Sequence, residues 1–168
     1  MNPVPVDIAL LGRRHDRTSL ECGEPALDDF FRRNALQNQE RGISRTYVAT
    51  PQGETRVLGF YTLAAGSVPV RDLPNAERRR LPRFPLPVVR LARLAVDRAA
   101  HRGGVGRALL ANALLRSARA ADIVGIFAVE VYAKQHAAAF YHRHGFAPLE
   151  DDRLHLYLPI STIQRGVG

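Results

Sequence analysis

The sequence predicts an α/β (α+β) fold in which a mixed sheet has a parallel strand pair at its centre. The first observation is the order of elements in the back half of the chain, where apolar strands alternate with helices. A strand followed by a helix and a second strand usually forms a parallel pair. The second observation is a length of 168 residues with 46% apolar residues, which fits one domain, residues 1–168, with a sizeable core.

The front half of the chain predicts a strand, a helix and a hairpin. Apolar residues recur at helical spacing over Leu27–Leu36, where Pro25 can occupy the first turn and Gly42 can end the helix. The turn residues Pro51–Gly53 separate two strand-like runs, as in a hairpin. The expected strands are Val6–Leu11, Thr46–Ala49 and Val57–Leu63.

The back half predicts three strands and two helices behind a basic loop. The segment Arg71–Pro87 is rich in proline and arginine, which indicates a loop with room for a short helix. Gly145 can close the second helix, which contains Phe140 and Tyr141. The expected strands are Val88–Val96, Ile123–Val131 and Asp152–Ile160, and the first expected helix is Ala108–Ala121.

Composition indicates a basic protein of the cytoplasm. The net charge of +8 favours polyanionic partners such as nucleic acid, an acidic protein or a phosphorylated cofactor, and the alternative is a solvated basic surface. Cys22 is the only cysteine, so an intramolecular disulfide and a metal–thiolate cluster are excluded, and we expect a reducing setting. The apolar runs are shorter than a membrane span of about 18 residues, and the first ten residues lack the pattern of a secretory signal.

The stretch His101–Leu110 contains three glycines where a strand gives way to a helix. In such a turn backbone amides point outward and the helix dipole favours negative charge, so the stretch predicts an anion site. Gly104 and Gly106 would let a ligand approach the backbone, and Arg102 and Arg107 would add positive charge. The alternative is a tight turn that needs glycine only for positive φ. A Walker loop and a dinucleotide fingerprint both fit the stretch poorly.

Two segments resemble the signatures of the GNAT acyltransferases. The segment "RLAVDRAAHRGGVGRALL" resembles the coenzyme A signature Gln/Arg-x-x-Gly-x-Gly/Ala: Gly104 and Gly106 match its glycines, whereas His101 stands at the Gln/Arg position with a shorter side chain. The segment "VYAKQHAAAFYHRHGFAPL" resembles the second signature, whose tyrosine faces the coenzyme A sulfur and protonates the departing thiolate. That tyrosine is Tyr141 here, and the alternative is that Tyr141 and Phe140 are helix core.

The resemblance covers almost the whole chain and is narrower for the toxin branch of the family, from bacterial toxin–antitoxin modules. Its four parts are "ECGEPALDDFFRRNALQNQERG", "VLGFYTLAAGSV", "VRLARLAVDRAAHRGGVGRALL" and "AFYHRHGF". It implies the GNAT fold, with a splayed parallel strand pair and helices on both faces, and acetyl-CoA as cosubstrate. It also implies N-acetylation of the amino acid on charged tRNA, a homodimer and a small ribbon-helix-helix antitoxin. The residues that it implies for cofactor binding are Leu94, Ala95, Val96, His101, Arg102, Gly103, Gly104, Val105, Gly106, Arg107 and Phe140.

The acceptor chemistry agrees with an α-amine on a phosphate-bearing substrate. At pH 7 about 15% of an α-amine is neutral, against about 0.04% of a lysine side chain, so an α-amine needs a carboxylate base far less. The strand Val88–Val96 carries Arg90 and Arg93 and no carboxylate, which suits phosphates and disfavours a cationic acceptor. The alternative is that both arginines lie on an outward face. We expect Asp97 to hold the turn after the strand, and Glu130 to act, at most, as a base through water.

The basic stretch Glu77–Phe84 is a candidate polyanion contact through Arg78, Arg79 and Arg80. Three interpretations stay open: contact with a tRNA backbone, a groove for an acidic antitoxin tail, and a solvated loop. No partner base is apparent near Cys22, so a packed thiol is favoured over an acyl-accepting nucleophile. The histidines lack metal-ligand spacing supported by acidic or thiolate partners, so no metal site is expected.

Three functions follow from these observations. The first is an acetyl-CoA-dependent N-acetyltransferase toxin that acts on aminoacyl-tRNA and blocks translation. The second is a GNAT enzyme for another amine, such as a protein N-terminus or a small metabolite. The third is a non-catalytic basic module that binds nucleic acid or regulates; the presence of Tyr141, Gly104 and Gly106 counts against it.

Overall fold

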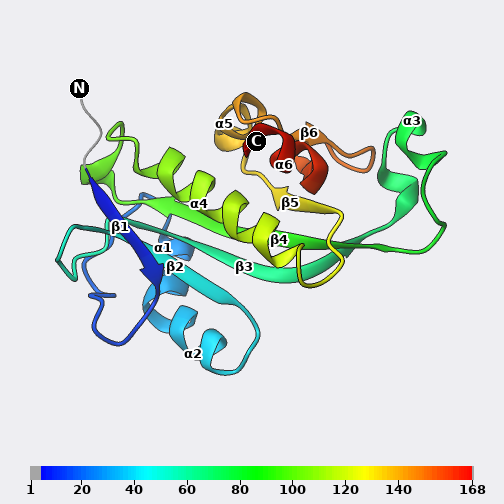
Figure 1. Ribbon diagram of the computed structural model, residues 1–168. Coiled ribbons are helices and arrows are strands. Elements are labelled where there is room, and N and C mark those ends of the chain that lie inside the picture. The colour runs from blue at the N-terminus through cyan, green and yellow to red at the C-terminus, as the bar shows by residue number, and fades with distance from the viewer. Residues whose placement is uncertain (1–4, 168) are drawn as a thin grey trace. The chain divides into compact units, whose positions relative to one another are not determined.

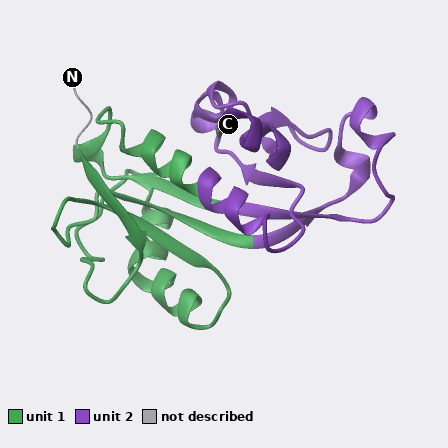
Figure 2. Cartoon of the chain, in the orientation of Figure 1, with its two compact units in different colours: residues 1–64, 92–113 green, residues 65–91, 114–168 purple. Residues whose placement is uncertain are grey.

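The computed structural model describes residues 5–167, which divide into two compact units (Figure 2). Unit 1 holds the described residues up to 64 together with 92–113, and unit 2 holds 65–91 and the described residues from 114 onward. The chain passes between the units within β3, β4 and α4. The strands and helices in chain order (Figure 1) are β1 (Val6–Leu10), α1 (Pro25–Arg33), α2 (Ala35–Glu40), β2 (Arg45–Pro51), β3 (Gly59–Val68), α3 (Asn75–Arg78), β4 (Leu86–Val96), α4 (Val105–Ala120), β5 (Ala128–Tyr132), α5 (Ala138–Arg143), β6 (Ala147–Pro148), β7 (His155–Pro159) and α6 (Ile160–Val167).

A seven-stranded mixed sheet has the strand order β1-β2-β3-β4-β5-β7-β6. The pairs β1–β2, β2–β3, β5–β7 and β6–β7 are antiparallel. β4 and β5 pair in parallel, with Val88–Arg90 opposite Ala128–Glu130. The parallel pair expected from the strand–helix–strand order is therefore confirmed, and α4 is the helix that connects its strands.

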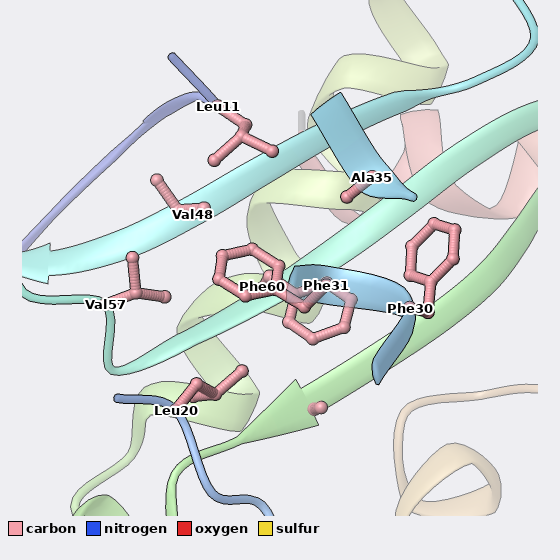
Figure 3. Packing of buried hydrophobic residues seen from close by; sticks show 9 residues of the cluster. Leu11, Leu20, Phe30, Phe31, Ala35, Val48, Val57 and Phe60 are labelled. Atoms are coloured by element: carbon pink, nitrogen blue, oxygen red, sulfur yellow. The ribbon is translucent and has the colours of Figure 1, made fainter. Parts of the chain in front are cut away.

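The core of unit 1 is built on aromatic residues that α1 places against the sheet (Figure 3). Phe31 of α1 stacks on Phe60 of β3, with ring centroids 4.6 Å apart and 22° between the ring planes. Both side chains are fully buried, which stabilises the fold by about 1.5–3 kcal/mol for each. The buried members of this cluster are Leu11, Leu20, Phe30, Phe31, Ala35, Val48, Val57, Phe60 and Ala95.

Helices cover both faces of the sheet within unit 1. α1 and α2 lie on one face, and the first part of α4 lies on the other (Figures 1 and 3). The expected helices on both faces are confirmed there, because α4 also buries Val105 and Leu109.

The basic segment before β4, residues 71–85, packs against the rest of unit 2. Leu73 within it is fully buried and belongs to a second core cluster that includes Val88 and Tyr157. The hydroxyl of Tyr157 donates a hydrogen bond to the carboxylate of Glu77. The backbone amide of Glu150 donates to the carbonyl of Asp72 at 2.7 Å. These contacts hold the backbone of the segment in place, so the arginines that it carries project from a fixed backbone.

The expected starts of the first helix in the back half and of the strand after it are wrong. The helix expected from Ala108 begins at Val105, directly after the glycine turn. The strand expected over Ile123–Val131 is β5 and begins only at Ala128. Ile123 and Val124 instead belong to a turn that follows α4, in which both of their amides donate to the carbonyl of Ala120. Ile123 is 89% exposed, so its apolar character reflects no core contact.

The expected front helix is divided at Asn34 into α1 and α2. Its expected end is confirmed, because Gly42 has a φ of +74°, and Gly145 likewise follows α5 with a φ of +95°. The strand expected over Asp152–Ile160 narrows to β7, and the short β6 and the helix α6 were not expected. No helix within residues 5–167 combines the length and the apolar character needed to cross a bilayer.

Candidate functional site

In unit 1, β4 ends in a turn that Asp97 holds in place. One carboxylate oxygen of Asp97 accepts from the amide of Ala99 at 2.9 Å and caps the short 3-10 helix Arg98–Ala100. The other oxygen accepts from the amide of Glu21 at 3.2 Å. Both oxygens are thus engaged by backbone donors, which agrees with the expectation that Asp97 holds the turn.

The glycine turn after this 3-10 helix leads directly into α4. Gly104 has a φ of +82°, a conformation that glycine adopts without strain, and Arg102 has a φ of +69°. The first hydrogen bond into α4 runs from the amide of Ala108 to the carbonyl of Gly104 at 3.0 Å. The amides of the residues between them have no acceptor inside the helix. A helix of 16 residues also places its positive dipole end there, so this turn can hold an anion.

The residues expected around this turn lie together in unit 1. Arg102 and Arg107 are exposed and can add charge beside the amides, whereas Val105 is buried and anchors the helix start. The end of β4, from Leu94 to Val96, leads into the same turn and buries Ala95. The structure therefore joins all the expected cofactor residues of the strand end and the turn; Phe140 belongs to unit 2.

In unit 2, α5 buries Tyr141 between two aromatic rings. The ring of Tyr141 meets Phe140 edge-on at 5.2 Å between centroids and Phe146 at 5.5 Å. Tyr141 is 5% exposed, and burial raises the pKa of its phenol to about 12. The hydroxyl therefore keeps its proton at neutral pH and can donate it in a hydrogen bond.

Arg90 and Arg93 lie in different units and have different partners. Arg90, in unit 2, donates from Nε to Oε1 of Glu130 at 2.7 Å, and its side chain is 37% exposed. Arg93, in unit 1, lies over the ring of Phe30, with the guanidinium carbon 3.6 Å from the centroid. Each arginine is held by a neighbour, so the interpretation of both as solvated residues on an outward face is disfavoured.

Glu130 is buried completely in unit 2 with both carboxylate oxygens occupied. Oε1 accepts from Arg90, and Oε2 lies 2.6 Å from Nε2 of His155. Nδ1 of His155 lies 2.9 Å from a carboxylate oxygen of Asp151. This arrangement disfavours Glu130 as a base acting through water. The sequence analysis missed His155 and Asp151; the only signal was a polar residue at an inward position of an alternating strand.

The basic segment of unit 2 surrounds a cavity of about 500 Å³. Two of the candidate polyanion contacts, Arg78 and Arg79, line it, and Arg80 is exposed nearby in the chain. Arg78 also donates to the carbonyl of Arg71 at 3.4 Å. The full lining is Pro69, Val70, Arg71, Asn75, Arg78, Arg79, Arg83 and Pro85.

The profile of the acetyltransferase (GNAT) domain matches residues 42–148. The chain belongs to the GNAT acetyltransferase family. A tRNA-acetylating toxin from Mycobacterium tuberculosis (strain ATCC 25618 / H37Rv) is 44% identical over 154 residues, which are 91% of each chain.

Two solved structures match this chain closely. One is AtaT complexed with acetyl-methionyl-tRNAfMet, with a TM-score of 0.91 at 29% identity over 98% of this chain and all of that chain. The other is a tyrosine-to-phenylalanine mutant of the AtaT toxin bound to acetyl-CoA and the C-terminus of the antitoxin AtaR. Its TM-score is 0.82 at 29% identity, over 96% of this chain and 98% of that chain.

His101 departs from the GNAT coenzyme signature, and its ring has another task here. Nε2 of His101 donates to the carbonyl of Val96 at 2.8 Å, so the ring folds back on the end of β4. The amides at the start of α4 do not depend on this side chain. A GNAT coenzyme site built on the backbone therefore fits the turn despite the missing long side chain.

Cys22 has the environment of a packed thiol in this GNAT protein. Burial, followed by the hydrogen bond to Asp28, raises the pKa of the Cys22 thiol to about 11. The thiol also donates to the carbonyl of Glu24 at 3.6 Å. A thiol that stays protonated at neutral pH is a poor nucleophile, so an acyl-cysteine intermediate is disfavoured.

Proposed function

We propose that this protein is a toxin that transfers the acetyl group of acetyl-CoA to the α-amino group of aminoacyl-tRNA and thereby blocks translation. The observation that carries the proposal is the 44% identity, over 91% of both chains, with a tRNA-acetylating toxin. The turn before α4 supplies the anion site that acetyl-CoA requires, and Tyr141 supplies a neutral phenol. We infer one acetyltransferase domain that spans residues 1–168.

Acetyl-CoA binding is assigned to the end of β4 and the turn before α4. The pyrophosphate would accept hydrogen bonds from the amides of Val105, Gly106 and Arg107, because these amides have no helical acceptor, whereas the amide of Gly103 already donates to the carbonyl of Ala100 at 3.2 Å. The exposed side chains of Arg102 and Arg107 would add charge-assisted contacts. Amides of Leu94, Ala95 and Val96 would bind the pantetheine and the thioester carbonyl, where donors also stabilise an oxyanion. Phe140 would supply apolar contact.

Tyr141 is assigned as the acid that protonates the departing thiolate. A phenol is neutral at physiological pH even without the rise in pKa that burial causes here, so the proton is present when the carbon–sulfur bond breaks. The attacking α-amine is partly neutral without help, and Glu130 is already engaged by protein partners. The mechanism therefore uses one side chain for proton donation and no dedicated carboxylate base.

Contacts with the tRNA are assigned to arginines of both units. Arg78 and Arg79, at the cavity of unit 2, and the exposed Arg80 would bind backbone phosphates. Arg90 and Arg93 would bind further phosphates, each with a guanidinium that a neighbouring side chain holds in place. The net charge of +8 supports such a polyanionic substrate.

Its partners follow from the toxins that it resembles. A related AtaT mutant is bound to the C-terminus of the antitoxin AtaR, and we infer a small ribbon-helix-helix antitoxin for this chain as well. We further infer a homodimer that works in the cytoplasm, where charged tRNA is found. The lone cysteine agrees with that reducing compartment.

The test is mass spectrometry of tRNA-linked amino acids after brief expression, with the purified protein, acetyl-CoA and bulk charged tRNA as its counterpart in vitro. We expect an N-acetyl mass on the amino acid of charged tRNA and no product from uncharged tRNA. Acetylation of peptides or small amines with charged tRNA untouched would instead support a different GNAT substrate. Failure to bind acetyl-CoA would leave only a non-catalytic module.

A further inference from the structure

An exposed aromatic ring lies beside Arg90 in unit 2. Tyr132 is the last residue of β5 and is 57% exposed, although large apolar rings are normally buried. The guanidinium carbon of Arg90 lies 5.6 Å from the centroid of this ring. The Arg90 side chain is 37% exposed. A flat ring and a planar cation are thus presented together.

The ring and the guanidinium are joined by a chain of polar side chains, of which Glu130 and His155 are buried. His155 stacks on Tyr132 with 4.0 Å between ring centroids and 11° between planes. Glu130 joins Arg90 to His155 through its two carboxylate oxygens. Asp151, which is 36% exposed, binds the far nitrogen of His155 and closes the chain.

Gly66 of β3 completes this arrangement because it leaves room for the ion pair. A Cβ at Gly66 would lie 3.2 Å from a terminal amino nitrogen of Arg90 and 3.4 Å from Oε1 of Glu130. Four neighbouring strands, β3, β4, β5 and β7, therefore contribute to one cluster. The backbone at Gly66 and the ring of Tyr132 therefore restrict the positions that the guanidinium of Arg90 can take.

The use of Nε in the ion pair decides which atoms of Arg90 face a ligand. Glu130 binds Nε, so the two terminal amino groups are not needed for that bond. A guanidinium fixed in this way presents a flat pair of donors, which matches the geometry of a phosphate. A completely buried carboxylate is expensive in free energy unless paired, and it stabilises a fold weakly even when it is. Its effect on the orientation of Arg90 explains the arrangement better than stability does.

We propose that Arg90 and Tyr132 form a binding site for an unpaired nucleotide, with the guanidinium on the phosphate and the tyrosine ring stacked on the base. Unpaired bases are recognised in this manner, by stacking on aromatic rings next to positive charge. Glu130, His155 and Asp151 are positioning residues that act through Arg90 and Tyr132. The inference rests on the proposed function, which supplies such a nucleotide as the single-stranded 3′ end of charged tRNA.

Coenzyme A also carries a nucleotide, so the test uses two acceptors and both KM values. The full chain is assayed with bulk charged tRNA and, separately, with an amino acid methyl ester, which has an α-amine and no nucleotide. Tyr132→Ala is expected to raise the KM for charged tRNA about tenfold. The KM for acetyl-CoA and the rate with the ester are expected to stay at the parent's values. Tyr132→Phe keeps the ring and is expected to recover the binding that alanine loses.

The matched control is Ile123→Ala, which removes another exposed apolar side chain of unit 2 outside the cluster. If the parent acetylates no charged tRNA, the proposed function itself fails. If the parent acetylates charged tRNA and Tyr132→Ala keeps the parent's KM, the nucleotide site is refuted alone. A rise in the KM for acetyl-CoA, with that for tRNA unchanged, overturns the assignment to the RNA end.

The positioning role is tested by combining substitutions at Glu130 and Arg90. Arg90→Lys keeps the charge but loses the fork, and is expected to raise the KM for charged tRNA about tenfold. Glu130→Gln is expected to do the same with kcat retained, and the double variant should show no further increase, because both changes disturb one guanidinium. If the two increases in the KM for charged tRNA multiply in the double variant, Glu130 does not act by positioning Arg90.

A milder pair of variants keeps the test decisive if Glu130→Gln fails to fold. Asp151→Asn alters the exposed end of the chain, and Gly66→Ala pushes the guanidinium without any change of charge. Each is expected to raise the KM for charged tRNA by about twofold to fivefold and to lose that effect in the Arg90→Lys background. If both variants keep the parent's KM for charged tRNA, the positioning role of this chain of side chains is overturned.

Discussion

The turn before α4 in unit 1 and the Arg90 cluster in unit 2 are both suited to phosphate, but they are built from different materials. The turn uses backbone amides, whose direction is set by the start of a helix and by the positive φ of Gly104. The cluster uses side chains, and a buried carboxylate, an imidazole and an aromatic ring hold its one guanidinium. The first site depends on conformation, and the second depends on partners.

This difference explains how each site responds to a changed residue. The turn tolerates His101 in place of the longer side chain of the GNAT signature, because the amides remain and His101 merely bonds to Val96. The cluster has no such tolerance, since removal of Glu130 would leave Arg90 without its only hydrogen-bonded carboxylate among the residues described. A site made from backbone amides should lose little affinity for its ligand when a side chain is changed, whereas a site made from side chains should lose much.

The largest effect is expected at Tyr141, where one side-chain atom is assigned to the chemistry. Tyr141→Phe keeps the edge-on ring contacts with Phe140 and Phe146 and removes only the proton donor. We expect kcat to fall at least about 100-fold, as for loss of a general acid, with the Kd for acetyl-CoA within about twofold of the parent. Steady-state kinetics and calorimetry would measure the two quantities. Unchanged turnover would remove Tyr141 from the mechanism.

A smaller effect is expected at Gly104, and it separates backbone from side chain directly. Gly104→Ala would place a Cβ at a φ of +82°, which costs about 1–2 kcal/mol and distorts the amides that follow. We expect the Kd for acetyl-CoA to rise about tenfold, as measured by calorimetry. His101→Ala, three residues earlier, is expected to change that Kd less than about threefold. A larger loss for His101→Ala than for Gly104→Ala would show that a side chain holds the coenzyme.

The same contrast decides how much of the molecule was predictable from sequence. The glycine turn is a contiguous stretch, so its place between a strand and α4 was predicted, as was the helix that carries Tyr141. The Arg90 cluster joins residues up to 89 positions apart, from Gly66 to His155, and no local spacing in the sequence indicates their contact. The strand expected at Ile123 failed for the opposite reason, because a local apolar run had no tertiary partner to bury it.

The smallest effect is expected at Asp97, a carboxylate that a sequence reader could mistake for a base. Its two oxygens accept from the amides of Ala99 and Glu21, so it acts on the backbone as a cap. Asp97→Ala should lower the free energy of unfolding by about 1 kcal/mol, as loss of a cap does, with kcat close to the parent's. Asp97→Asn keeps an oxygen acceptor and should lose less. Chemical denaturation and kinetics would measure both, and a large fall in kcat without loss of stability would make Asp97 part of the chemistry. A small loss of stability with kcat unchanged would mean that unit 1 binds acetyl-CoA through backbone amides, and that the carboxylate of Asp97 only shapes the turn.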